Sequence, residues 1–373
     1  MTLKSHRYHE LDTLRAVAAL GVVCWHYVNA FQAAPFGHVL APFFRRGLLM
    51  VDFFFILSGF VLARAFWTPQ RSGQLVWNVW SRVARLYPLH LTTLVIVALL
   101  QWYLVAALKS GPFVYHDNSP YNLGLNLLLL QNSGLQNGAS FNAPSWSIST
   151  EFLANVAFLA IITLPRKAAA VGMATLGGVA LYGLISHGII QGGNIFGVFD
   201  GGIVRTFAGF FLGVGLYKLH QHTAKGEYRL TFDLITLITM VLIGIYLASP
   251  SWWSKQGDAL CSFVGFPLVI FATIRTRFFH SLFSKPILVY LGEISYSIYL
   301  VHFPLQLLFH VVETSCGIHF AYGSRWMFAA FMVAVISTAS ITYRWIEVPG
   351  RQWMMSCLSP RLRPIPDDSM KAH

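Results

Sequence analysis

Residues 47–67 read GLLMVDFFFILSGFVLARAFW, and only Asp52 and Arg64 in this stretch carry a charge. A helix needs about 20 mostly apolar residues to cross a bilayer, so the stretch predicts a transmembrane helix. Its apolar residues run on without the period-two alternation of a membrane barrel strand, which excludes that architecture.

The rest of the chain has the same character. Hydrophobic residues make up 55% of the 373 residues and charged residues only 11%, whereas a soluble domain has about 25% charged residues. This composition excludes a soluble enzyme, a disordered chain and a nucleic-acid binder. We expect an all-α, polytopic membrane helix bundle of about ten transmembrane helices. They are predicted at 11–31, 47–67, 86–108, 146–164, 168–190, 203–219, 229–249, 258–274, 286–311 and 322–346.

The lysines and arginines are distributed unevenly between the predicted loops. With the N-terminus placed in the cytoplasm, two arginines fall inside spans, Arg15 and Arg205, and most of the other basic residues face the cytoplasm. The positive-inside rule then places both termini in the cytoplasm and explains the net charge of +12 without nucleic acid. The basic residues left on the outer side are Arg45, Arg46, Lys109, Lys255 and Arg325.

This topology predicts one transmembrane domain, residues 1–348, and a short, basic, loosely ordered cytoplasmic tail, residues 349–373. The outer loop at about 109–145 is long enough to form a lid or an acceptor platform. Within it, Leu123–Leu130 is apolar but too short to span the bilayer. The four cysteines are scattered without a CxxC pair, so no metal site is expected.

Ionisable residues inside spans are costly and therefore point to function. Arg15 and His26 lie eleven residues apart on nearly the same face of the first span, about 16 Å along its axis. Asp52 and Glu151, from two other spans, fall near the depth of His26. We expect one of these carboxylates to orient the imidazole, although structural hydrogen bonds between helices would explain the same residues.

Two smaller patterns accompany this group. Ser58 and Asp52 face different directions on their helix, so a Ser-His-Asp triad is disfavoured, and Ser58-Gly59 fits a close helix contact. Arg82 and Arg85 share a helix face at i, i+3 and could grip phosphates or anchor the chain to acidic lipids.

The segment at 286–311 carries a further polar face. Ser295, Tyr299 and His302 follow at i, i+4 and i+7. Pro304 should kink the helix and free the carbonyl of Leu300, to which a tyrosine could donate.

Five motifs in this order resemble the acyltransferase-3 family of integral-membrane transacylases. They are LDTLR at 11–15 followed by His26, DFFFILSGF at 52–60, RVARLYP at 82–88, WSISTE at 146–151 and SYSIYLVH at 295–302. The resemblance implies acyl-CoA as donor and co-substrate, with acetyl as the usual group, and a sugar hydroxyl as the usual acceptor. It also implies functional roles for Arg15, His26, Arg82 and Arg85.

Together these inferences predict a multi-pass enzyme of the bacterial inner membrane that acetylates an extracytoplasmic glycan. His26 would act as general base or form an acyl-histidine, with Asp52 or Glu151 beside it. Arg15, Arg82 and Arg85 would bind the CoA phosphates. A lipophilic small-molecule acceptor and a flippase for lipid-linked saccharide remain the alternatives. Residues expected to contact the acceptor are Trp146, Ser147, Tyr296, Tyr299 and His302.

Overall fold

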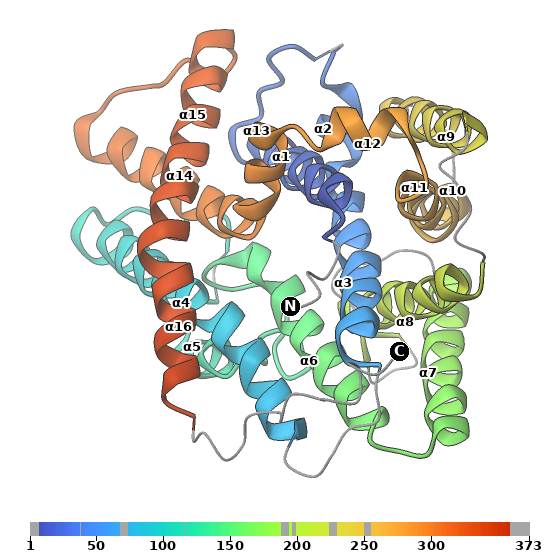
Figure 1. Cartoon of the computed structure of the whole chain (residues 1–373). Helices are drawn as coiled ribbons and strands as arrows, with labels where there is room; N and C mark the ends of the chain where they lie inside the picture. Colours follow the sequence, from blue (N-terminus) through green and yellow to red (C-terminus); the bar gives the residue numbers. More distant parts are fainter. Residues whose placement is uncertain are drawn as a thin grey trace.

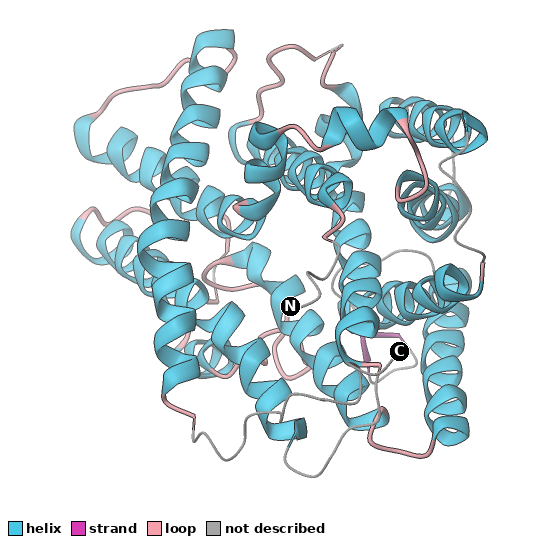
Figure 2. Ribbon diagram, in the orientation of Figure 1, coloured by secondary structure: helices cyan, strands magenta, loops and turns pink. Residues whose placement is uncertain are grey.

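The computed structural model describes residues 7–37, 39–67, 74–115, 117–187, 194–195, 199–223, 230–249 and 255–358. Nearly all the regular secondary structure in this part of the chain is helical, and loops join the helices, as Figure 2 shows. A two-residue antiparallel pair, β1 (Asn194–Ile195) with β2 (Phe199–Asp200), is the exception.

Long helices are interspersed with short ones along the chain. The first half of the chain contains α1 (His9–Phe31), α2 (Ala41–Arg46), η1 (Gly47–Leu49), α3 (Met50–Phe66), α4 (Gln74–Trp102), η2 (Tyr103–Ala107), α5 (Pro120–Leu127), η3 (Ala143–Ser145), α6 (Trp146–Ile161) and α7 (Arg166–His187). The second half contains α8 (Gly201–His222), α9 (Leu230–Ala248), α10 (Lys255–Leu260), η4 (Cys261–Gly265), α11 (Phe266–Thr273), α12 (Phe278–Phe283), α13 (Pro286–Glu293), α14 (Ser295–Cys316), α15 (Arg325–Thr342), η5 (Tyr343–Glu347) and α16 (Val348–Ser356).

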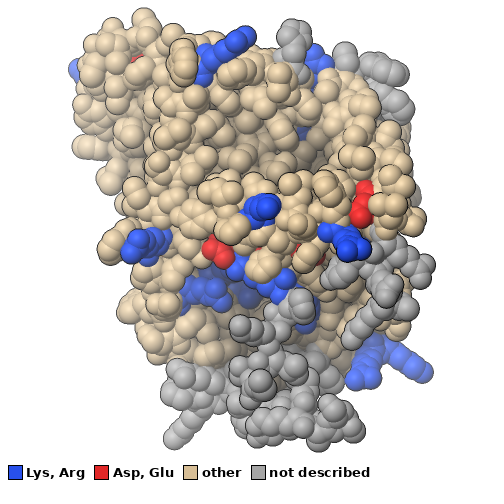
Figure 3. Space-filling model, turned by 45° about the horizontal axis from the view of Figure 1, so that its top comes forward, with Lys and Arg blue, Asp and Glu red and all other residues tan. Residues whose placement is uncertain are grey.

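Nine helical segments of the described chain are long and apolar enough to cross a membrane. They coincide with nine of the ten predicted spans. The remaining one, 146–164, is helix α6, but its 16 residues fall short of the usual length of about 20. Figure 3 shows a nearly uncharged belt of surface between basic groups at one edge and a charged band across the middle, as expected for a membrane-embedded protein.

Two boundaries differ from the expected ones. The segment predicted at 286–311 breaks at Ile294 into α13 and α14. Helix α13 packs directly on α1, where a Cβ on Gly292 would lie 2.0 Å from the carbonyl oxygen of Asp12. The first part of the expected loose tail, residues 349–356, is helical instead, and Trp80 Nε1 of α4 donates to the carbonyl of Met354 at 2.8 Å. Residues 359–373 lie outside the described part.

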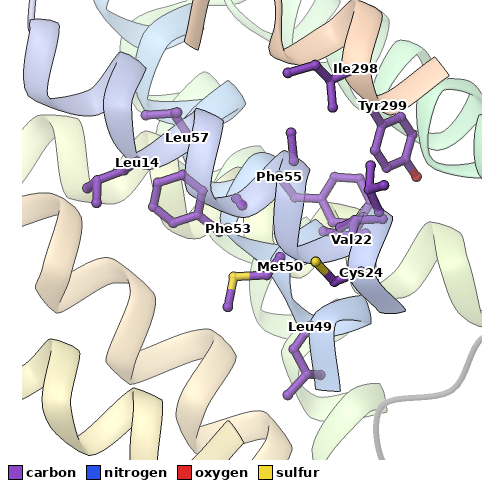
Figure 4. Close-up of a cluster of buried hydrophobic side chains, with 14 of the residues drawn as sticks. Leu14, Val22, Cys24, Leu49, Met50, Phe53, Phe55, Leu57, Ile298 and Tyr299 are labelled. Atoms are coloured by element: carbon purple, nitrogen blue, oxygen red, sulfur yellow. The ribbon is translucent and has the colours of Figure 1, made fainter. Parts of the chain in front are cut away.

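The main core joins α1, α3 and α14. Figure 4 shows its side chains interleaving, with Val22 from α1, Phe55 from α3 and Ile298 from α14 all at most 1% exposed. The five motifs lie on α1, α3, α4, α6 and α14. In Figure 1, α7 to α11 lie on the right, whereas α15 and α16 lie on the left together with α4 and α14.

The packing of α3 on α8 confirms the predicted small-residue contact. A Cβ on Gly59 would lie 1.9 Å from the carbonyl oxygen of Phe210, and a Cβ on Gly213 would lie 1.9 Å from that of Ile56. Only glycine lets the two backbones approach this closely. The contact fixes α3, and with it Ser58, whose side chain reaches toward α6.

Candidate active site

A cavity of about 260 Å³ lies between α1, α3, α4, α6 and α14. One end is basic and the other is lined by apolar and aromatic side chains, including Val51, Phe54 and Ile148. All five sequence motifs contribute residues to the lining. Its full polar set is Arg15, Ser58, Arg82, Arg85, Ser147, Glu151, Ser295, Tyr296 and Tyr299.

The basic end combines the arginines of two helices. Arg82 and Arg85 lie in α4, where their i, i+3 spacing turns both toward the cavity, and Arg15 reaches it from α1. Among the described residues, no carboxylate lies within 4 Å of Arg82 or Arg85, and the buried Nε of Arg82 has no hydrogen-bond partner. Burying a cation without a counter-charge costs free energy. This end is therefore built for an anion, and a lipid anchor would not need the arginines to face a cavity.

Glu151 lies between the two ends. Its Oε1 accepts a hydrogen bond of 2.7 Å from Ser58 Oγ, which joins α6 to α3 across the cavity. The sequence pattern places Ser58 only at a helix contact. The structure therefore gives Ser58 a polar role that helical spacing within α3 could not show, because its partner lies 93 residues away.

Two tyrosines of α14 line the cavity and are held in place by hydrogen bonds. Tyr299 Oη donates to the carbonyl of Pro144 at 2.8 Å and lies 2.8 Å from Ser147 Oγ, while Tyr296 Oη donates to the carbonyl of Leu86 at 2.6 Å. Trp146 is not part of the cavity lining. Its ring packs against Phe55, with centroids 5.9 Å apart.

His26 lies just beyond the aromatic end. Its Nδ1 is 3.0 Å from the carbonyl of Val22. A carbonyl only accepts, so Nδ1 must carry the proton and Nε2 is left with a free lone pair. The His302 ring lies between His26 and the cavity, with centroids 4.7 Å from His26 and 5.9 Å from Tyr299. His302 is fully buried, and neither of its nitrogens has a partner among the described residues.

The expected carboxylate partner of His26 is absent from its described surroundings. Asp52 is 0% exposed and forms an ion pair with Arg205, with Oδ1 2.5 Å from Nε, and Ser262 Oγ donates to its Oδ2 at 2.6 Å. Glu151 bonds Ser58. The expectation that Asp52 or Glu151 orients His26 is therefore not met, because a backbone carbonyl does so. The pairing of Asp52 with Arg205 could have been suspected from two opposite intramembrane charges.

The outer loop at 109–145 is not a free lid in this structure. Asn142 is fully buried and donates to Thr93 Oγ1 at 3.0 Å and to the carbonyl of Leu300 at 3.1 Å. The Leu300 carbonyl released by Pro304 is thus used by Asn142 and not by a tyrosine. The loop is thereby tied to α4 and α14, two of the helices that line the cavity.

Replacement of Asn142 should loosen this attachment. Asn142→Leu removes both donors and leaves the Leu300 carbonyl unsatisfied, at a cost of about 1–3 kcal/mol. We expect a lower midpoint of thermal unfolding in detergent. Asn137→Leu, at an exposed position of the same loop, is the control. Equal midpoints for the two variants would contradict a supporting role for Asn142.

Comparisons with known proteins agree with this architecture. The family model described as "Acyltransferase domain" matches residues 8–344. "Acyltransferase MdmB" of Streptomyces mycarofaciens is 36% identical over 167 residues, which cover 43% of this chain and 41% of that protein. "Protein 2 in picA locus" of Rhizobium radiobacter is 32% identical over 165 residues, covering 41% of this chain and 81% of that protein.

No solved structure matches the chain significantly. The matched region spans less than half of the Streptomyces protein, so that relative speaks for only part of the chain. The family match, in contrast, runs from just before α1 through the whole of α15 into η5, and it includes every helix that lines the cavity. The chain therefore belongs to the acyltransferase family.

Proposed function

We propose that this protein is a multi-pass O-acyltransferase of the bacterial inner membrane, with both termini in the cytoplasm. It would transfer an acyl group, acetyl by family resemblance, from cytoplasmic acyl-CoA to a hydroxyl of an extracytoplasmic glycan. The observation that carries the proposal is the cavity, with Arg82 and Arg85 at one end without a carboxylate within 4 Å among the described residues, and a free imidazole nitrogen just beyond the other end.

The donor fits the basic end by charge. CoA carries phosphates on one side of a long, slender pantetheine arm and the thioester on the other. Arg15, Arg82 and Arg85 would bind phosphate through charge-assisted hydrogen bonds. The arm would then extend toward Tyr299, covering much of the roughly 16 Å rise that separates Arg15 from His26 along α1.

The chemistry follows from the tautomer of His26. Nε2 would take the proton of the acceptor hydroxyl as its oxygen attacks the thioester carbonyl. The C–O bond forms, the C–S bond breaks, and the proton passes from Nε2 to the leaving CoA sulfur. The partly exposed position of His26 supports entry of the acceptor from the side opposite the arginines.

The donor site can be tested by binding. We expect Arg82→Gln and Arg85→Gln each to weaken acetyl-CoA binding by about tenfold to a hundredfold, since a hydrogen bond to a charged group contributes roughly 1.5–3 kcal/mol. Isothermal titration of the purified full-length protein measures this. Arg166→Gln, exposed at the start of α7, is the matched control.

The same titration separates the enzyme from its alternatives. Unchanged affinity in both variants would contradict the phosphate assignment. Absence of acetyl-CoA binding to the wild type would reject acyl-CoA as donor and favour a flippase.

A further inference from the structure

A second, wider opening adjoins the basic end of the cavity. It has a volume of about 1070 Å³ and shares Arg15, Leu57, Val61 and Arg85 with the cavity. We call it the vestibule. Pockets for small molecules usually measure roughly 300–1,000 Å³, so the vestibule has room for a nucleotide, whereas the cavity admits only a slender chain.

Most charges in the vestibule are already compensated. Arg7 bonds Asp12 and Glu293, each at 2.7 Å. Burial lowers the pKa of Arg7, but these two hydrogen bonds leave the pKa raised overall, so the group stays charged. Arg15 pairs with Asp12 at 3.7 Å.

Arg351 is different. It is exposed, lines the vestibule, and has no carboxylate within 4 Å among the described residues. It also lies within electrostatic reach of Arg85 and of Glu347. Glu347 carries one negative charge and interacts with Arg15, Arg85 and Arg351 alike. It can balance only one of these three positive charges, so a further anion beside Arg85 and Arg351 would be stabilised.

The fold holds this arrangement in place. Helix α16 approaches α4 so closely that a Cβ on Gly350 would lie 2.6 Å from the Pro88 side chain. The hydrogen bond from Trp80 to the Met354 carbonyl secures the same contact. Arg351 is therefore carried on a helix docked beside Arg85, although sequence alone predicts a loose tail at this position.

We propose that the vestibule binds the nucleotide end of acyl-CoA and that Arg351 binds its 3′-phosphate. This inference rests on the proposed function. CoA has two separate phosphate groups, a pyrophosphate next to the pantetheine arm and a phosphomonoester on the ribose. The pyrophosphate would bind to the arginines at the basic end of the cavity. The phosphomonoester, which is farther from the thioester, would reach Arg351.

The experiment compares CoA with 3′-dephospho-CoA. Full-length protein in phosphatidylcholine nanodiscs is titrated with each ligand, as wild type, Arg351→Gln and Arg344→Gln. Arg344 is exposed in the adjacent η5 and does not line the vestibule, so its variant is the charge-matched control.

We expect the wild type to bind CoA at least about tenfold more tightly than dephospho-CoA, equivalent to about 1.4 kcal/mol. Arg351→Gln should bring the ratio close to one and leave the affinity for dephospho-CoA unchanged. Arg344→Gln should keep the wild-type ratio. The wild-type ratio should also persist when acidic phosphatidylglycerol is added to the nanodiscs.

Several results would overturn the inference. The inference is wrong if the wild type binds CoA and dephospho-CoA with equal affinity. It is also wrong if Arg351→Gln still prefers CoA, because Arg351 then does not bind the 3′-phosphate. Loss of the preference on adding phosphatidylglycerol would assign the site to a lipid headgroup. Binding of both ligands without preference leaves the proposed function standing, whereas binding of neither ligand rejects both proposals.

Discussion

His26→Gln should lower acyl transfer by about 10²- to 10⁴-fold, the usual contribution of a general acid–base group. The reason is local. Nδ1 of His26 is committed to the Val22 carbonyl, so Nε2 is the atom that can take a proton. Acetyl-CoA binding should stay within about twofold of wild type, because the arginines that would bind the phosphates lie at the other end of the cavity.

Two measurements check this expectation. The acetyl content of surface glycans is compared by mass spectrometry in cells that express each variant at matched membrane levels. Acetyl-CoA binding is measured on the purified proteins. His222→Gln, an exposed histidine at the end of α8, is the control. If His26→Gln kept full transfer while remaining folded, the mechanism would be wrong.

Much of the fold could be predicted because a bilayer demands long apolar helices, and hydropathy records them directly. The errors lie where tertiary contact overrides that signal. The break at Ile294 lies next to the close packing of Gly292 against Asp12, and helix α16 is docked on α4. Neither contact is local in sequence, so no window of hydropathy could reveal it.

The candidate site shows the same division. Helical spacing predicts that Arg82 and Arg85 share a face, and the structure confirms that both reach one cavity with Arg15. The position of Asp52 along its span predicts that it lies at the same membrane depth as His26. Depth does not reveal which neighbouring helix the side chain faces. Asp52 turns to Arg205 instead.

The strongest structural effect should come from that ion pair. Asp52→Asn would leave the Arg205 guanidinium, 1% exposed, without its counter-charge. Removing one partner of a buried pair costs about 3–5 kcal/mol, whereas replacing the whole pair by apolar side chains is often neutral. We therefore expect Asp52→Asn to lower the thermal unfolding midpoint strongly, and Asp52→Leu/Arg205→Met/Ser262→Ala to recover most of the loss.

The apolar triple variant also decides what Asp52 does. Its carboxylate contacts Arg205 and Ser262 and does not line the cavity, so a stable variant without it should bind acetyl-CoA and transfer the acyl group within a few-fold of wild type. If a stable triple variant binds acetyl-CoA but has lost acyl transfer, Asp52 takes part in the reaction with His26. Replacing all three buried polar groups at once is informative because the effect on stability and the effect on acyl transfer can then be measured separately in one protein.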